Sequence, residues 1–409
     1  MVKPIARSPS INRRMFFQSA KAAGTTALTA SLFGQRYRPI DAGKQLRIGV
    51  VGGGFGAAFP WHRHPNCKVT AVADLREDRR KRLEERFECS NAHADFRAML
   101  KDPAVDAVAI FTGAPRHVPH CVEVMESGRH VISAVPAAIS LKQCQELLEA
   151  VKKTGQIYMM AETSCFHPAT MTARRLRKEG RFGRIYYTQG DYIHNHGTYL
   201  AKGEMPEYLE RMFFHEGRRT WRYGNAQGLY ITHASGPVIY VTGESLVEVA
   251  AVGTPLDHPF YKENRYGNPF LNTTFFFKTS GGNSSRINIH WWTSAPGREG
   301  ADFFGTEMSL FERWKGLRPS AYVTRPDSEP ELLRADHSAE LPPSLRNVEG
   351  HGGSHPFIIH EFVSACLEQR PPVVDVHQAL SYTAPGIVGF HSALKGGDWL
   401  KIPDFGPVS

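Results

Sequence analysis

The chain has 409 residues, of which 41% are hydrophobic, so it is long enough for two domains that each bury a core. Its formal net charge is +9, but residues 1–47 alone carry +8, and the rest of the chain holds 40 basic and 39 acidic side chains. The basic charge therefore belongs to a leader, which argues against nucleic-acid binding by the main body. No apolar run is long enough to span a bilayer, so we expect no transmembrane segment.

The first 44 residues have the layout of an export signal. Arg13 and Arg14 precede two phenylalanines, and a mildly apolar run rich in Ala, Thr and Leu extends to Phe33. This order resembles a twin-arginine signal, and the alternative is a disordered basic tail. We expect residues 1–44 to be a signal and linker, and the protein to be exported to the periplasm. The twin-arginine route carries folded proteins, so a bound cofactor would travel with the chain.

Cysteines and histidines give little support for disulfides or a metal site. The six cysteines show no C-x-x-C spacing, so we expect buried free thiols even though an exported protein could form disulfides. His194 with His196, and His351 with His355, invite a zinc interpretation. No third ligand stands out beside either pair, so we predict no metal.

The first strand of the main body opens a dinucleotide-binding unit. The apolar run 48–51 predicts a strand that is buried on both faces, and Gly52, Gly54 and Ala57 follow it with the G-x-G-x-x-G/A spacing. The first glycine permits a tight turn, the second lets a pyrophosphate approach the backbone, and the small third residue lets the next helix pack closely. The N-terminus of that helix would bind the pyrophosphate. Phe55 lies inside the loop, so we also place it at the cofactor.

An acidic residue stands where such a unit holds the adenosine ribose. Asp74 ends the second predicted strand, 22 residues after Gly52, at the distance from which a carboxylate reaches the ribose hydroxyls. It would repel a 2′-phosphate, which favours NAD over NADP, although Arg76 and Arg79 nearby weaken that preference. We therefore predict NAD as the cofactor. A glycine turn in another α/β fold is the plainer alternative.

Strands and helices alternate up to residue 162. The pattern predicts helices over 76–86, 95–101, 117–127 and 141–154, and strands over 105–111, 130–133 and 156–161. Thr112, Pro115 and His117 lie in the loop at the carboxyl end of a predicted buried strand, where ligands bind in such sheets. The alternation predicts an α/β fold with a doubly wound parallel sheet, and we place a Rossmann domain at residues 45–162.

After residue 162 the pattern becomes that of an α+β domain, which we place at residues 163–409. The expected elements are helices over 169–179, 356–369 and 376–395, and strands over 183–194, 246–252, 271–278, 286–292 and 307–312. Residues 197–227 are irregular in pattern, and the polar, proline-rich segment 325–354 predicts a long surface loop. An open, mostly antiparallel sheet, with the C-terminal helices packed back on the core, fits this pattern.

The motifs of the first domain resemble those of the Gfo/Idh/MocA oxidoreductase family. They are Thr112…Pro115…His117, Gly128-Arg-His130-Val131 and a loop that contains Pro136. In that family the sheet of the second domain faces the nicotinamide, builds the substrate site and often forms the subunit interface. The resemblance therefore implies NAD, a small-molecule substrate, and a homodimer or higher homo-oligomer through the C-terminal sheet.

A narrower resemblance arises because the chain lacks the Glu-Lys-Pro motif of the ordinary reductases. Their lysine relays a substrate proton, whereas this chain has Ala134-Val135-Pro136, and valine cannot move a proton. Several segments instead resemble the NAD-dependent glycosidases of glycoside hydrolase family 109, the alpha-N-acetylgalactosaminidase type. They are Val-Pro-Ala-Ala at 135–138, Met159-Met160-Ala-Glu162, Gly190-Asp-Tyr192-Ile-His194, and Gly228-Leu-Tyr230-Ile-Thr-His233 followed by Gly236-Pro237.

This narrower resemblance implies a set of site residues. Tyr230, His233 and Tyr192 would be catalytic, Glu162 and Arg222 would bind the sugar, and Glu162 could instead hold the nicotinamide ribose. Arg218 and Arg219 stand close to Arg222 in the sequence and are alternatives for the same role. A further candidate for substrate contact is His351, which lies in a glycine-rich segment.

The resemblance also implies a route for the reaction. NAD takes hydride from C3 of the sugar, a base removes the acidified C2 proton, the anomeric group leaves, water adds, and the hydride returns. His233, with an ordinary pKa of about 6.5, could accept the C3 hydroxyl proton. Tyr230 or Tyr192 could take the C2 proton if Arg222 lowered its pKa from about 10. A cofactor that ends as it began suits an exported enzyme.

Other interpretations stay open. The Tyr-x-x-His pair could be core packing, and the tryptophans at 221, 291 and 292 could either stack on a sugar or fill the core. We compare three functions for the whole chain: an exported glycosidase that retains NAD, an ordinary NAD-linked sugar dehydrogenase, and a non-catalytic sugar-binding protein.

Overall fold

The computed structural model describes residues 37–41, 43–197, 202, 205–255, 263–317 and 320–408. The predicted export signal lies almost wholly outside these residues and stays a prediction. None of the helices in the described part of the chain is long and apolar enough to cross a membrane. All six cysteines are free and buried, as the sequence predicted.

The first domain is built on a six-stranded parallel sheet with the order β3-β2-β1-β4-β5-β6. Its strands are β1 (Leu46–Val51), β2 (Cys67–Ala73), β3 (Ala92–His93), β4 (Ala107–Ile110), β5 (His130–Ser133) and β6 (Tyr158–Met160). Its helices are α1 (Glu77–Phe87), α2 (Phe96–Met99), α3 (His117–Glu126) and α4 (Leu141–Thr154). This is the doubly wound order, which directs ligands to the carboxyl ends of β1 and β4, where the winding reverses.

The segment after β1 corrects one expectation. Instead of a regular helix it forms two short 3₁₀ turns, η1 (Gly56–Ala58) and η2 (Trp61–Arg63). An α-helix that began at the glycine loop would hold Pro60 in its interior, where proline removes a hydrogen bond and clashes with the preceding turn. The buried rings of Phe59 and Trp61 pack on helix α9 (His355–Glu368) instead, since Phe59 stacks on His355 with ring centroids 4.0 Å apart.

The second domain is built on a nine-stranded sheet with the order β16-β15-β14-β13-β7-β12-β11-β10-β17. Its strands are β7 (Ile185–Ile193), β10 (Leu246–Pro255), β11 (Phe270–Thr279), β12 (Ser284–His290), β13 (Arg298–Gly305), β14 (Ser309–Glu312), β15 (Ala321–Thr324), β16 (Glu331–Leu333) and β17 (Leu400–Lys401). Among the described strands of this sheet only the β7–β12 pair is parallel, so the mostly antiparallel sheet is confirmed.

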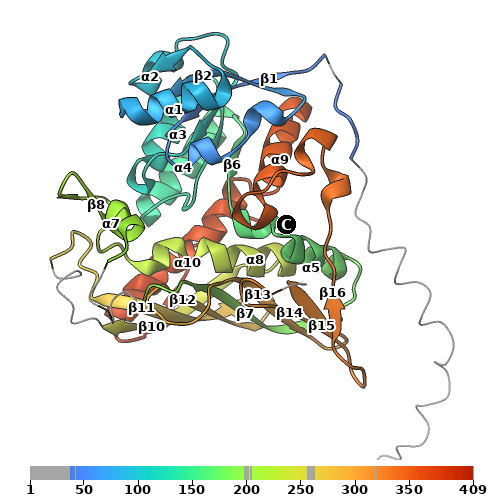
Figure 1. The fold of residues 1–409 in the computed structure, drawn as a ribbon. Coiled ribbons are helices and arrows are strands. Elements are labelled where there is room, and N and C mark those ends of the chain that lie inside the picture. The colour runs from blue at the N-terminus through green and yellow to red at the C-terminus, as the bar shows by residue number, and fades with distance from the viewer. Residues whose placement is uncertain are drawn as a thin grey trace, which may run out of the picture.

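Helices separate the two sheets. Helices α5 (Pro168–Lys178), α8 (Thr232–Thr242) and α10 (Val376–Leu394) lie between the large sheet and the first domain (Figure 1). The strands bury one set of alternating side chains under these helices, such as Val249 and Ala251 of β10. Val252 and Phe276, whose side chains point the other way, are 62% and 45% exposed. That face is where the predicted subunit interface would form, and the interface stays a prediction.

Several segments differ from the sequence-based expectation. Strand β13 was missed because its sequence is charged and rich in glycine; its Arg298 is satisfied by buried ion pairs with Asp191 and Asp302. The segment expected to be irregular contains α7 (Glu207–Phe213), β8 (Phe214–His215) and β9 (Arg218–Arg219). The predicted long loop 325–354 contains β16 and three 3₁₀ turns, Ser338–Glu340, Pro343–Leu345 and His351–Gly353.

Candidate active site

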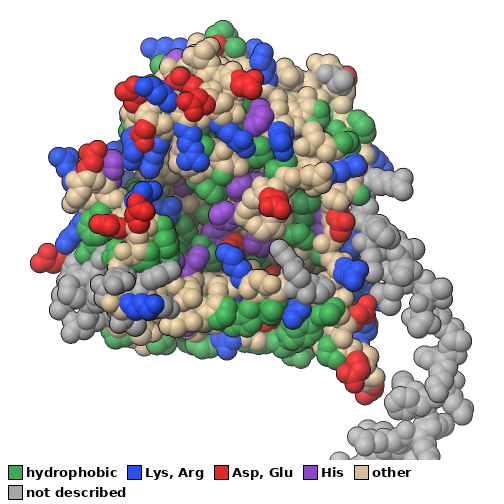
Figure 2. Space-filling view, viewed as in Figure 1, with side chains coloured by type: hydrophobic (Ala, Val, Ile, Leu, Met, Phe, Trp, Pro, Cys, Tyr) green, Lys and Arg blue, Asp and Glu red, His purple; other side chains and the backbone are tan. Residues whose placement is uncertain are grey.

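A cavity of about 1220 Å³ lies between the two domains. Figure 2 shows it as a hollow with histidine side chains inside. It is larger than the roughly 300–1,000 Å³ of a typical small-molecule pocket, so a dinucleotide and a second molecule can share it. Its walls combine the carboxyl ends of the first sheet with β7, α7, η5 (Gln227–Tyr230) and α8 of the second domain.

The glycine loop forms the wall at β1. Gly52 has a φ of +101°, and a Cβ atom there would lie 2.4 Å from the carbonyl oxygen of Phe111. Only glycine fits such a turn without moving the end of β4. The Arg79 guanidinium lies beside Gly54 and lines the same wall, so a cation stands next to the predicted pyrophosphate position.

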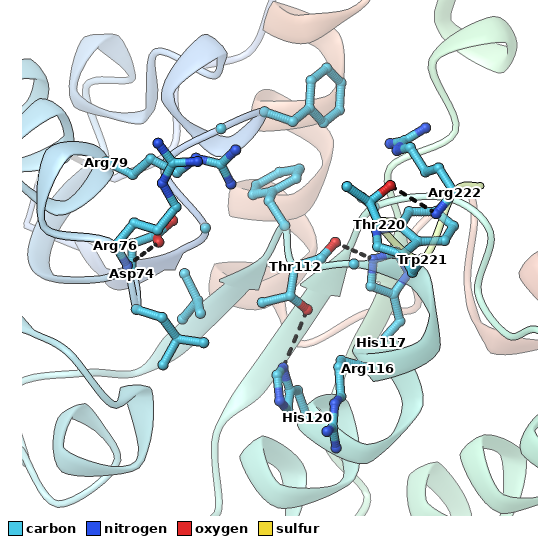
Figure 3. Close-up of a pocket in the computed structure, with 18 of the residues that line it drawn as sticks. Asp74, Arg76, Arg79, Thr112, Arg116, His117, His120, Thr220, Trp221 and Arg222 are labelled. Carbon is cyan, nitrogen blue, oxygen red and sulfur yellow. Dashed lines mark hydrogen bonds between the residues drawn. The ribbon is translucent and has the colours of Figure 1, made fainter. Parts of the chain in front are cut away.

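Asp74 lies at the carboxyl end of β2 and braces this loop. Its Oδ2 accepts the backbone N–H of Gly53 at 2.7 Å, and its Oδ1 accepts that of Arg76 at 2.8 Å (Figure 3). A carboxylate has about four acceptor positions, so two hydrogen bonds leave room for ribose hydroxyls. The side chain lines the cavity, as a ribose-binding residue must.

His117 joins two loops at the middle of the cavity. It is buried, and its ring nitrogens lie 2.8 Å from the Pro136 carbonyl and 2.9 Å from the Thr112 carbonyl. Burial lowers the pKa of His117, and the two carbonyls oppose that effect. The histidine thereby fixes the loop after β4 against the loop after β5. Trp221 lies directly against Gly113 of the first loop, where a Cβ atom would come within 2.6 Å of the indole nitrogen (Figure 3).

The structure brings most of the predicted cofactor residues to the cavity wall. Those that line it are Gly52, Gly54, Phe55, Asp74, Thr112 and His117. Ala57, Pro115, Pro136 and Glu162 do not line it. Ala57 and Pro136 are buried behind the wall, where they shape the loops instead of facing a ligand.

The other end of the cavity gathers the predicted catalytic residues. Tyr192 comes from β7, Tyr230 ends η5 and His233 lies in the first turn of α8. The ring centroid of His233 is 4.4 Å from that of Tyr192 and 6.3 Å from that of Tyr230. All three line the cavity together with Arg222 and His351. The residues predicted to be catalytic therefore converge on one surface.

Two carboxylates hold His233 from behind. Its Nδ1 lies 2.9 Å from Oε1 of Glu162, which follows β6, and 3.4 Å from Oε1 of Glu299 on β13. The Ser164 hydroxyl lies between Glu299 and His233, 2.6 Å from Oε1 of the acid and 3.2 Å from Nδ1 of the histidine. Glu162 is completely buried, so it lies behind the histidine instead of facing a sugar as predicted.

The charge state of His233 corrects another expectation. Burial lowers the pKa of His233, but the carboxylates of Glu162 and Glu299 outweigh burial and raise it to about 10. The imidazole is therefore protonated at neutral pH in this structure, and it is not a group with an ordinary pKa. It can donate a proton at once, and it can accept one only after losing the proton it holds.

The tyrosines correct the role expected of Arg222. Burial raises the pKa of both Tyr192 and Tyr230, and Arg222, whose guanidinium carbon lies 5.4 Å from the Tyr230 ring centroid, offsets this only in part. Glu299 raises the pKa of Tyr192 further. Neither tyrosine is poised as a base by the protein alone.

The His233 cluster also has the donor types of a metal site. The nearest ligand atoms of Glu162, His233 and Glu299 lie within 4.8 Å of one another. The 2.9 Å contact from Nδ1 to Glu162 has the length of a charge-assisted hydrogen bond, so we describe the cluster as an ion-pair network. The absence of a metal stays a prediction.

Sequence reasoning missed several residues of the site. Glu299 lies on a strand that the pattern did not reveal, and no local signal marks it. Thr163 follows directly after Glu162 and could have been found from that position. Val135, which stands where the reductases have lysine, lines the cavity as well. Residues of the α7–β9 segment, Arg211, Met212, Phe214 and His215, line the cavity from a stretch that was read as irregular.

Comparisons with known proteins place the first domain in a family. Residues 46–162 match the model of the Gfo/Idh/MocA family, described as "Oxidoreductase family, NAD-binding Rossmann fold". A glycosyl hydrolase family 109 protein of Streptomyces coelicolor is 24% identical over 98% of this chain and 95% of its own length. An alpha-N-acetylgalactosaminidase of Bacteroides fragilis is 31% identical over 147 residues, which are 36% of this chain and 33% of that protein.

A solved structure supports the architecture. A levoglucosan dehydrogenase in complex with NADH and levoglucosan has a TM-score of 0.73 and 21% sequence identity, and the match covers 88% of this chain and 100% of that one. At this identity the likeness shows the fold alone. Together the matches confirm the resemblance seen in the sequence. Residues 46–162 form an NAD-binding Rossmann domain that matches the Gfo/Idh/MocA oxidoreductase family, and the chain resembles glycosyl hydrolase family 109 proteins along nearly its whole length.

Proposed function

We propose that the chain is an NAD-dependent glycosidase that oxidises C3 of its sugar transiently and keeps its cofactor. The observation that carries the proposal is the distribution of acids around the cavity. Of the described residues that line it, Asp74 and Asp95 are the only carboxylates, and both follow strands at the nucleotide end. Direct glycoside hydrolysis usually needs two carboxylates that flank the scissile bond. The sugar end instead offers Tyr192, Tyr230 and His233.

These residues suit an elimination route. When bound, NAD would supply the hydride acceptor and later the hydride donor at C3. His233 would exchange the proton on the C3 oxygen through Nε2, since Nδ1 is held by the carboxylates. A tyrosine would remove the C2 proton, the bond from C1 to the leaving group would break, and water would add across C1 and C2. Arg222 lowers the pKa of either tyrosine toward that task, although burial outweighs it in the protein alone.

Turnover in D₂O tests the route directly. Elimination must break the C2–H bond and protonate that carbon again from a base that exchanges with water, so the released sugar should carry deuterium at C2. Direct displacement never touches C2. NMR of the sugar released from an aryl glycoside panel measures this, with the same sugar incubated with the enzyme but never glycosylated as control. Complete retention of protium during confirmed hydrolysis would contradict elimination.

Cofactor retention gives a second test. We propose that the leader exports the folded protein, which would separate it from the cytoplasmic NAD pool. NAD should therefore co-purify and survive dialysis, and turnover should proceed without added NAD. Absorbance and mass spectrometry of the acid-released nucleotide measure retention. Loss of the nucleotide on simple desalting would count against a redox-neutral enzyme.

A sugar dehydrogenase is the second candidate. The match of residues 46–162 to an oxidoreductase family favours it, because the same His233 could serve a net oxidation. NADH that accumulates in proportion to sugar, with no hydrolysis across the glycoside panel, would select it over the glycosidase. Sugar binding without either product would indicate a non-catalytic protein.

A further inference from the structure

We propose that Glu299 is a positioning residue that fixes the His233 ring, so that Nε2 faces the cavity and Nδ1 keeps its proton. Its effect on turnover rests on the proposed function, whereas its effect on the ring does not. Glu299 is not among the residues that line the cavity, although its side chain is 24% exposed, and we assign its action to His233, whose Nδ1 lies 3.4 Å from its Oε1.

The sheet register places Glu299 behind the site. Glu299 of β13 pairs with Tyr192 of β7, so the acid and the tyrosine enter the site from neighbouring strands. Its Oε1 collects three side chains: the Ser164 hydroxyl at 2.6 Å, Nδ1 of His233 at 3.4 Å and the Thr163 hydroxyl at 3.5 Å. The carboxylate is therefore tied to the turn that follows β6 as well as to the histidine.

The hydroxyl of Ser164 decides what Glu299 does to the ring. Because this hydroxyl donates to Glu299, it presents a lone pair to Nδ1 of His233, 3.2 Å away. Every group near Nδ1 then accepts a hydrogen bond, and only a protonated Nδ1 satisfies them. Without the charge of Glu299, one of the two carboxylates that favour a proton on Nδ1 is lost, and Glu162 alone stabilises that proton.

The two acids reach His233 from different domains. Glu162 follows β6 of the first sheet, and Glu299 belongs to the second sheet, on which the histidine's own helix packs. Glu162 alone supplies one acceptor, whereas acceptors from two directions restrain the orientation of the ring. A ring held in this way keeps Nε2 in one place for a ligand.

Other charged or titratable groups face His233 and remain in place when Glu299 is changed. Glu162 lies behind the ring, and His167 lies beyond Glu299, with its Nε2 3.9 Å from Oε1 of Glu299. The others around the histidine are Tyr192, His194, Arg222, Tyr230 and His351. The test must therefore separate the contribution of Glu299 from that of Glu162.

The variant Glu299→Gln keeps the shape and removes the charge. Opposite charges within hydrogen-bond reach raise a histidine pKa, so the variant should lower that of His233 by about 1–3. The measurement is ¹⁵N NMR of the full-length protein with labelled histidine rings, with the His233 signals assigned by their loss in His233→Asn. Turnover should fall by about 10²-fold in kcat, with KM nearly unchanged, and Glu299→Asp should restore part of it.

Two controls keep the test sharp. Glu329→Gln changes an exposed acid in the turn between β15 and β16 and should alter neither the ring signals nor turnover. Glu162→Gln should shift the same NMR signals, and it shows how far the loss of one carboxylate moves the pKa of His233. Unchanged tautomer and titration of His233 in Glu299→Gln would overturn the proposal even if activity fell. A shifted ring in an enzyme that hydrolyses no glycoside would support the positioning role and contradict only the glycosidase.

Discussion

Tyr230→Phe should reduce turnover by about 10²–10⁴-fold while leaving the free energy of unfolding nearly unchanged. The Tyr230 hydroxyl is buried and has no hydrogen-bond partner within the described residues, so its removal breaks no internal hydrogen bond. A hydroxyl kept in that state lines the cavity beside His233, where a substrate can pair with it. Initial rates on the glycoside panel and thermal unfolding with and without NAD measure the two effects.

Substitution of His233 by alanine is a poor test of its role in turnover. His233→Ala would leave the buried carboxylate of Glu162 without its partner, which typically costs about 3–5 kcal/mol. The double variant His233→Asn with Glu162→Gln removes the charge of the histidine and of the fully buried acid, and Glu299 keeps its hydrogen bond from the Ser164 hydroxyl, so the fold and bound NAD should persist while turnover is lost to a similar degree. If Tyr230→Phe, Tyr192→Phe and this double variant all keep near wild-type rates, the cluster is structural and the site lies elsewhere.

Gly52→Ala should abolish tight NAD binding. The added methyl group would lie 2.4 Å from the carbonyl oxygen of Phe111, and the φ of +101° is unfavourable for any residue with a Cβ. The loop and the end of β4 must move apart, which shifts the wall that holds the cofactor. We expect a loss of affinity of at least about tenfold, equivalent to about 1.4 kcal/mol, measured by calorimetry on cofactor-free protein.

The chain contains a matched control for that change. Gly155 also has a positive φ, +66°, and caps α4, but nothing lies within 4 Å of its added methyl group. Gly155→Ala should therefore lower stability through backbone strain alone and leave NAD affinity unchanged. Equal losses of affinity in both variants would show that destabilisation, and not the glycine loop, explains the result.

The parts of the molecule that local chemistry determines were predictable. The strand, the glycine spacing and Asp74 give the nucleotide end of the cavity, because each depends on residues close in the sequence. The Tyr-x-x-His segment placed Tyr230 and His233 correctly on one surface. The helix after β1 was wrong because Pro60 outweighed the fold-level expectation, a conflict that the sequence already contained.

The parts that depend on tertiary packing were not predictable. Strand β13 does not look like a strand, since its charged residues are paired only once Asp191 of β7 lies beside it. Glu299 is therefore invisible until the sheet is assembled. The pKa of His233 follows from the same assembly, because Glu162 and Glu299 are 137 positions apart in the chain and meet only at Nδ1.

The two 3₁₀ turns after β1 change how the first domain must hold an anion. A long α-helix presents roughly half a positive charge at its N-terminus, and a three-residue turn aligns too few peptide dipoles to do so. We therefore expect the Arg79 guanidinium beside Gly54, a formal charge on an exposed side chain, to supply much of the attraction for the pyrophosphate. Dissolved ions screen such a charge where it is exposed, over a Debye length of about 8–10 Å. We therefore expect the affinity for NAD to fall as the ionic strength of the compartment in which the enzyme works rises.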